Sequence, residues 1–301
     1  MGHRLRIALL AVLSMLPGAF AAAADAPHPV TLWQVNGDSN SVYLLGSIHL
    51  LRPEDYPLPT ALYAAYDDAE VLIMEIDMDD MDPFAAQVAF TTYGVLKDEQ
   101  TLRDLMGDDL YAQALAAAEM IDIPLDMLRK TEPWYAAMTV QLMMLSRIGF
   151  DPTLGVEMHM MSKAQADGKP IEGFETVEEQ VRFLDGMSLP AQREMLLSTL
   201  TESAKLGEMM DEMIDAWRHG DIAVLEADML EEIASHEELN KALVTDRNAR
   251  WVSRIDSLLD DSDDYLIIVG ALHLIGKDGV PTQLRGLGYD VRQLSEPPTV
   301  R

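Results

Sequence analysis

Tyr265-Leu266-Ile267-Ile268-Val269-Gly270-Ala271-Leu272-His273 joins an unbroken apolar run to a Gly-x-x-His tetrapeptide. A continuous apolar run of this length is typical of a strand that is buried on both faces of a sheet. Glycine at the strand end permits a tight turn, and the histidine then lies at the carboxyl edge, where open α/β sheets build their sites. The stretch therefore predicts a central strand and a candidate functional residue, His273.

The same arrangement occurs near the N-terminus. Residues 41–48 form a β-rich run that contains Gly46 and is followed by His49, so a second Gly-x-x-His motif ends a second predicted strand. Residues 30–35 form another β-rich run before it. The Asn-Gly-containing connection between the two runs predicts a hairpin.

A third apolar run, Val71–Ile76, contains a carboxylate at Glu75. A charged group within a buried strand is costly unless it is paired or binds a metal. From residue 108 to about residue 264 the apolar spacing is mostly helical. We therefore expect an α/β (α+β) fold with a central sheet formed by the N- and C-terminal segments. The mostly helical middle of the chain would be a large insertion or cap.

The N-terminus has the pattern of a secretory signal peptide. Arg4 and Arg6 precede an apolar run, and small residues follow it before Asp25. We expect a signal peptide over residues 1–24, a single domain over residues 25–301, and a periplasmic or secreted location. The rest of the sequence has no second long apolar stretch, so no stable membrane anchor is expected after cleavage.

Composition excludes several partners and cofactors. The chain of 301 residues has 22 Lys and Arg against 51 Asp and Glu, a net charge of −29. Such acidity argues against nucleic acid and against anionic membranes as partners. The absence of cysteine excludes disulfides, thiolate nucleophiles, iron–sulfur clusters and a lipid-anchored N-terminus. The 20 methionines are expected to be flexible core or cap surface rather than a copper site. The sequence leaves the oligomeric state open.

His49, Glu75 and His273 form the candidate catalytic set. Two imidazoles and a carboxylate from three strand ends can hold a divalent metal with an open position for water. They can equally act without a metal, as an acid/base group. Each residue alone also has a structural reading, as a core or surface side chain.

Supporting residues are expected in the middle of the chain. Glu157 and His159 are two positions apart on a predicted helix, so at most one of them can face a common site. Glu175 and Gln180 flank a Thr176–Glu179 capping box. Arg247 would pair with a buried carboxylate or hold an anionic substrate group.

The chain resembles the TraB/GumN (TraB/PrgY/GumN) family over nearly all of its mature length. The resemblance is carried by the following motifs: Leu44-Leu45-Gly46-Ser47-Ile48-His49-Leu50, Met74-Glu75-Ile76-Asp77, Gly155-Val156-Glu157-Met158-His159, Gly168-Lys169-Pro170-Ile171, Phe174-Glu175-Thr176 with Gln180, Trp217-Arg218-His219-Gly220-Asp221, Arg247-Asn248 with Trp251, and Val269-Gly270-Ala271-Leu272-His273-Leu274-Ile275-Gly276 followed by Asp278-Gly279-Val280. One departure is Glu157, where the family has Asp about as often.

The resemblance implies a relationship to Tiki-type metalloproteases, erythromycin esterases and haem-binding ChaN-like proteins. It places the family's proposed catalytic set on His49, Glu75 and His273. Two functions follow from it. The first is a secreted metal-dependent hydrolase, a peptidase or an esterase, that acts on a peptide or small-molecule substrate. The second is a non-catalytic envelope protein that binds haem, a metal or a small ligand in the same pocket.

Overall fold

The computed structural model describes residues 28–77, 82–202, 206–230 and 237–295. The signal peptide expected over residues 1–24 lies outside these ranges. Within them, no helix combines the length and the apolar character that crossing a membrane requires.

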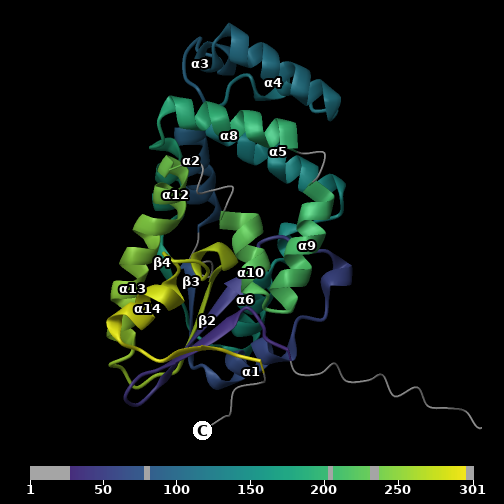
Figure 1. Ribbon diagram of the computed structural model, residues 1–301. Helices are drawn as coiled ribbons and strands as arrows, with labels where there is room; N and C mark the ends of the chain where they lie inside the picture. Colours follow the sequence, from purple (N-terminus) through teal and green to yellow (C-terminus); the bar gives the residue numbers. More distant parts are fainter. Residues whose placement is uncertain (1–27, 78–81, 203–205, 231–236, 296–301) are drawn as a thin grey trace, which may run out of the picture.

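A six-stranded mixed sheet forms the base of the molecule (Figure 1). Its strands are β1 Leu32–Asn36, β2 Ser41–Ser47, β3 Val71–Ile76, β4 Ile171–Glu175, β5 Tyr265–Gly270 and β6 Val291–Gln293. Their spatial order is β4-β3-β5-β2-β1-β6. The four strands β4, β3, β5 and β2 run parallel, and β1 is antiparallel to both β2 and β6. The α/β expectation is confirmed, with the middle of the chain supplying β4.

The apolar runs occupy the centre of the sheet. Every residue of β2 and of β5 is buried, and the two strands pair in register from Val42↔Tyr265 to Ser47↔Gly270. Each buried Leu, Ile or Val side chain contributes about 1.5–3 kcal/mol by leaving water. The predicted hairpin is also present, since β1 pairs with β2 from Leu32↔Leu45 to Asn36↔Ser41.

Helices cover both faces of the sheet. Through β2–α1–β3 and β3–α6–β4 the chain crosses the sheet toward the edge formed by β4. Through β4–α13–β5 and β5–α14–β6 it crosses back toward the edge formed by β6. With right-handed crossovers, α1 and α6 therefore lie on one face and α13 and α14 on the other, as Figure 1 shows. The bounds of these helices are α1 Thr60–Asp68, α6 Val156–Asp167, α13 Asp246–Leu258 and α14 Val280–Leu287.

The helical middle stands over the sheet and has apolar clusters of its own (Figure 1). Its helices are α2 Pro83–Gly94, α3 Leu102–Met106, α4 Asp108–Met120, α5 Pro133–Arg147, α7 Val177–Asp185, α8 Leu189–Glu202, α9 Leu206–Arg218, α10 Ile222–Leu225 and α12 Glu237–Asn240, with π-helical segments η5 Glu226–Leu230 and η6 Lys241–Thr245. Short 3₁₀ turns are η1 Pro53–Asp55, η2 Leu125–Leu128, η3 Pro152–Leu154 and η7 Ala271–His273. The expected Thr176–Glu179 capping box opens α7.

Candidate active site

The four parallel strands end at one edge of the sheet and each brings a candidate side chain there. His49 follows β2, Glu75 lies near the end of β3, Glu175 ends β4, and His273 lies in η7 directly after β5. Registers Ser47↔Gly270 and Ile76↔Glu175 place these ends side by side. The carboxyl edge is where ligands bind in open parallel sheets.

Gly270 lies at the centre of this edge. Its N–H donates to Oε1 of Glu75 at 2.8 Å, and a Cβ atom at this position would lie 3.3 Å from both that oxygen and Nε2 of His49. Oε1 of Glu75 is also 3.8 Å from Nε2 of His273. The structure thus brings the three residues of the predicted catalytic set around one glycine. Gly46 lies deeper in β2, where its carbonyl accepts from the Trp217 indole at 2.6 Å.

His49 is held by a buried carboxylate. Its Nδ1 lies 2.7 Å from Oε1 of Glu157, which also accepts from the Ser47 hydroxyl. Glu157 reaches this position because α6 begins against the backbone of His49, with the Cβ position of Gly155 only 2.2 Å from the His49 carbonyl oxygen. The negative charge of Glu157 raises the pKa of His49 to about 9. The His49 side chain is nevertheless 60% exposed, and its Nε2 lies near Gly270.

His273 has the opposite environment. It is buried beside Trp251, with the ring centroids 4.4 Å apart. Nε2 lies 3.1 Å from Nη1 of Arg247, and Nδ1 lies 2.6 Å from Oδ1 of Asn248. Because a guanidinium only donates, Nε2 must be the acceptor and Nδ1 must carry the proton. Burial, with the positive charge of Arg247, lowers the pKa of His273 to about 3.

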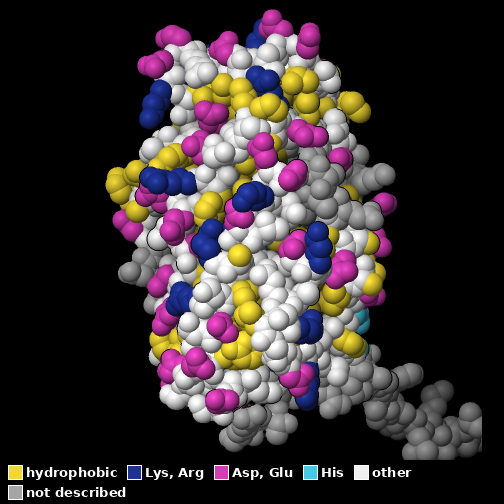
Figure 2. All heavy atoms as spheres, turned by 60° about the vertical axis from the view of Figure 1, so that its left-hand side comes forward, with side chains coloured by type: hydrophobic (Ala, Val, Ile, Leu, Met, Phe, Trp, Pro, Cys, Tyr) yellow, Lys and Arg dark blue, Asp and Glu magenta, His cyan; other side chains and the backbone are white. Residues whose placement is uncertain are grey.

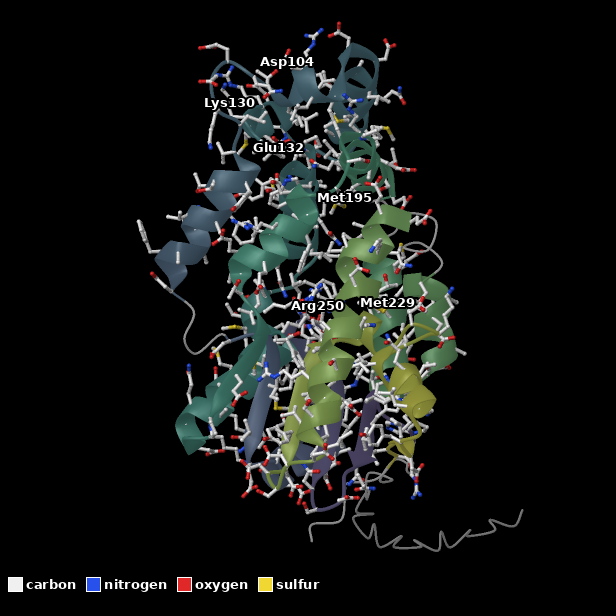
Figure 3. All side chains as sticks on the ribbon, turned by 90° about the vertical axis from the view of Figure 1, so that its left-hand side faces the viewer. Asp104, Lys130, Glu132, Met195, Met229 and Arg250 are labelled. Atoms are coloured by element: carbon white, nitrogen blue, oxygen red, sulfur yellow. The ribbon has the colours of Figure 1, made fainter. Side chains whose placement is uncertain are left out.

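Arg247 joins two strand-end carboxylates. Its Nη2 lies 2.6 Å from Oε2 of Glu75 and 2.8 Å from Oε2 of Glu175, and its Nε donates to Glu175 at 2.9 Å. The Gln180 amide also donates to both carboxylates, at 3.0 and 3.3 Å. Arg250, one turn further along α13, contacts Glu175 at 2.9 Å and lies where the sheet meets the helical layer (Figure 3). These residues form the Arg247 cluster.

The Arg247 cluster keeps Glu75 ionised. Burial alone would raise the pKa of Glu75. Positive charge beside the carboxylate, together with the Gly270 N–H, instead holds this pKa far below its ordinary value. With His273 neutral, Arg247 and His49 supply that charge.

These contacts do not fit a divalent metal held by His49, Glu75 and His273. A ligating imidazole must offer a lone pair, but Nε2 of His273 already accepts from Arg247 and Nδ1 is protonated. The same guanidinium binds Oε2 of Glu75. Among the described residues, no group of three or more His, Asp or Glu side chains is arranged to hold a metal ion. A cationic side chain of the protein contacts both Glu75 and His273.

Helix geometry separates the two candidates on α6. Glu157 is at the site, whereas His159 lies against Tyr63, whose hydroxyl is 3.1 Å from its Nε2. Two residues that orient the histidines, Ser47 and Asn248, stand in the family motifs, but the sequence assigned them no role. The Asn248 amide also donates to the His273 carbonyl at 3.1 Å. The sequence held a signal that Arg250 lies near the site, because Arg250 is three positions from Arg247 on one predicted helix and shares its face.

Comparison with known proteins agrees with this architecture. The chain is 28% identical over 251 residues to proteins described as "Uncharacterized protein YbaP" from Escherichia coli (strain K12) and from Shigella flexneri, covering 81% of this chain and 87% of theirs. No solved structure matches it. The model of the TraB/PrgY/gumN family matches residues 31–293, a span that includes all six strands and every candidate site residue. The chain therefore belongs to the TraB/PrgY/gumN family.

Proposed function

We propose that the protein is a hydrolase of esters or amides in which His49 transfers the proton and the Arg247 cluster fixes the surrounding charge. The observation that carries this proposal is the environment of His49. One ring nitrogen is held by the buried Glu157 carboxylate, and the exposed ring presents the other nitrogen beside Gly270. An imidazole oriented by a carboxylate, with its second nitrogen accessible, is the arrangement that general-base catalysis uses.

In the proposed reaction, neutral His49 removes a proton from water through Nε2 as the water oxygen bonds to the substrate carbonyl carbon. The bond to the leaving alcohol or amine then breaks, and His49 returns the proton to that leaving group. Glu157 stabilises the imidazolium between the two steps. Glu75 and Arg247, paired at 2.6 Å, form a fixed dipole beside the reacting atoms that needs no reorganisation during the reaction.

The family resemblance suggests a second form of the same function, hydrolysis with a divalent metal on His49, Glu75 and His273. The position of Arg247 favours the metal-free form. We also propose that the protein acts in the periplasm or after secretion, because its N-terminus has the basic, apolar and small-residue regions of an export signal.

The test is hydrolysis by purified residues 25–301 of p-nitrophenyl acetate, p-nitrophenyl octanoate and fluorescent casein. His49→Ala should lower the hydrolytic rate by at least about 100-fold, the usual contribution of a positioned acid/base group. The matched control is His219→Ala. His219 is also about half exposed, with Nδ1 3.3 Å from a carboxylate oxygen of Asp215, but lies in the turn directly after α9 and contacts none of the candidate catalytic residues. A His49→Ala protein that hydrolyses as fast as His219→Ala would refute the role of His49.

A further inference from the structure

A large cavity adjoins the candidate active site. Its volume is about 670 Å³, within the usual range for small-molecule sites, and it lies between α5, α8, α9 and the segments η5 and η6. Leu272, between Gly270 and His273, forms part of its wall. So does Leu243, whose carbonyl accepts from Arg247 at 3.2 Å. The cavity and the site therefore share a wall.

Methionine dominates the lining of this cavity. Six methionine side chains line it: Met144, Met195, Met209, Met210, Met213 and Met229. Figure 3 shows Met195 in the upper helical layer and Met229 at the level of Arg250. Unbranched thioether side chains adapt their shape to flexible apolar ligands. Aromatic side chains, which would stack on planar rings or sugars, are absent among the described residues of the wall.

The charged groups of the lining all have one sign. They are the carboxylates of Glu194, Glu202, Glu237 and Glu238, and none of the described lining residues is Lys, Arg or His. Acidic side chains are also spread over the outer face in Figure 2. Such a wall repels a carboxylate or phosphate head group and accommodates a neutral or cationic one. A free fatty acid or a phospholipid therefore fits the wall poorly.

We propose that this cavity binds the acyl chain of the substrate, a long unbranched chain in an ester or amide whose other half is neutral or cationic. The proposal rests on the proposed hydrolase function, and its link to the site is Leu272, which lines the cavity and lies between Gly270 and His273 in the chain. It assigns the methionines a role in selecting substrate chain length. Acyl chains gain binding energy with each buried methylene, so a cavity of this size favours long chains over acetyl groups.

Binding is tested without turnover, using dodecyltrimethylammonium and dodecanoate below micelle-forming concentrations in calorimetric titrations. Wild-type protein should bind the cation at least about tenfold more tightly than the anion of equal chain length. His49→Ala should bind the cation like wild type. Equal affinity for the two probes would overturn the charge selection, and failure to bind either would overturn the site.

Filling the cavity gives a second test. Thr199→Phe, from a lining position on α8, should weaken binding of dodecyltrimethylammonium by at least about tenfold, since loss of room for one or two methylenes costs that much. It should also lower hydrolysis of p-nitrophenyl octanoate relative to acetate. Thr201→Phe is the matched control, because both threonine hydroxyls donate to the carbonyl four residues earlier on α8 but Thr201 is exposed.

Ala191→Leu, at another lining position, replaces Thr199→Phe if the melting temperature of that variant falls. If the filled and control variants bind alike, the cavity is not the acyl site, whatever the effect of His49→Ala on hydrolysis. If filling abolishes binding while wild type hydrolyses nothing, the cavity stands and the hydrolase function fails.

Discussion

Arg247 donates a hydrogen bond to Nε2 of His273 at 3.1 Å and thereby fixes that histidine as a neutral ring with its proton on Nδ1. His49 has the opposite state, because Glu157 raises its pKa to about 9 while the pKa of His273 falls to about 3. Two copies of one sequence motif therefore supply two different groups. Environments that separate the pKa values of two like residues in one site are a means of assigning acid/base roles. We assign proton transfer to His49 and positioning to His273.

The pH dependence of hydrolysis should report this assignment. His49 acts as a base only when neutral, so kcat/KM of the wild type should rise with pH, and the midpoint of this rising limb should lie near the pKa of about 9. Glu157→Gln removes the negative charge that holds the proton on His49, so the limb should move to lower pH, toward the ordinary histidine value. The measurement is kcat/KM for p-nitrophenyl octanoate across about pH 5 to pH 10. A limb that stays in place in Glu157→Gln would belong to another group.

The stability of the protein should depend on the same pair. The folded pKa of His49, about 9, lies above the ordinary histidine value of 6.5, so the folded state holds the proton more tightly. This contribution is fully present below pH 6.5 and is lost as the pH rises through 9. Urea midpoints of the wild type should therefore fall over this window more than those of Glu157→Gln. The difference should be small, because His49 is 60% exposed and solvent screens the pair. Parallel curves for the two proteins would show that the pair does not stabilise the fold.

Removing Arg247 should be far more damaging than removing Arg250. Arg247→Ala leaves the carboxylates of Glu75 and Glu175 in a buried site without their main counter-charge, which costs about 3–5 kcal/mol of unfolding free energy. Arg250→Ala is the matched control, because Arg250 also contacts Glu175 but is half exposed, and its loss should cost only about 0–1 kcal/mol. Urea unfolding of both variants measures the difference. Similar losses would mean that the buried position of Arg247 gives it no special role.

The sheet could be predicted from the sequence because its central strands are continuous apolar runs with no competing helical spacing. The positions of His49, Glu75 and His273 at one edge followed from strand direction alone. Pairing of Arg247 with a buried carboxylate was expected and is present, but the partners in the ion pairs could not be predicted. Glu157 pairs with His49, 108 positions earlier, and Arg247 pairs with Glu75 across 172 positions. Local patterns show which residues carry charge, but only the folded topology determines which charges meet.

Arg247 also bears on the metal expectation, which stays a prediction. The sequence indicated that Arg247 would pair with a buried carboxylate or hold an anionic substrate group, and neither expectation placed a guanidinium between Glu75 and His273. The lone pairs on Oε2 of Glu75 and Nε2 of His273 can bind a metal ion or accept hydrogen bonds from an arginine. The sequence is compatible with either. Helical periodicity was informative at a shorter range, since it indicated that Glu157 and His159 would not share the site.

The N-terminal signal predicts a processed protein. The apolar run and the alanines before Asp25 should direct export and cleavage, so the mature chain should begin between Ala23 and Ala26. Mass spectrometry of the protein from a periplasmic extract of an expressing bacterium measures this directly. Replacing Leu9 and Leu10 with Arg should block export, because a charged segment cannot act as the apolar region of a signal. Intact Met1 on the extracted protein would refute the signal peptide.

Metal dependence can be decided by thermal melting, which needs no substrate. A ligand bound only by the folded state raises the melting temperature by mass action, so removal of a resident metal must lower it. Because Arg247 binds Oε2 of Glu75 and Nε2 of His273, we expect that EDTA leaves the wild-type melting temperature and hydrolytic rate unchanged, and that added Zn²⁺ or Mn²⁺ does not restore activity to His49→Ala. His49→Ala and His219→Ala should melt alike with and without EDTA. If EDTA lowers the melting temperature of wild type and His219→Ala but not of His49→Ala, then His49 ligates a metal. The arginine would then have to leave Glu75 and His273 when the ion binds.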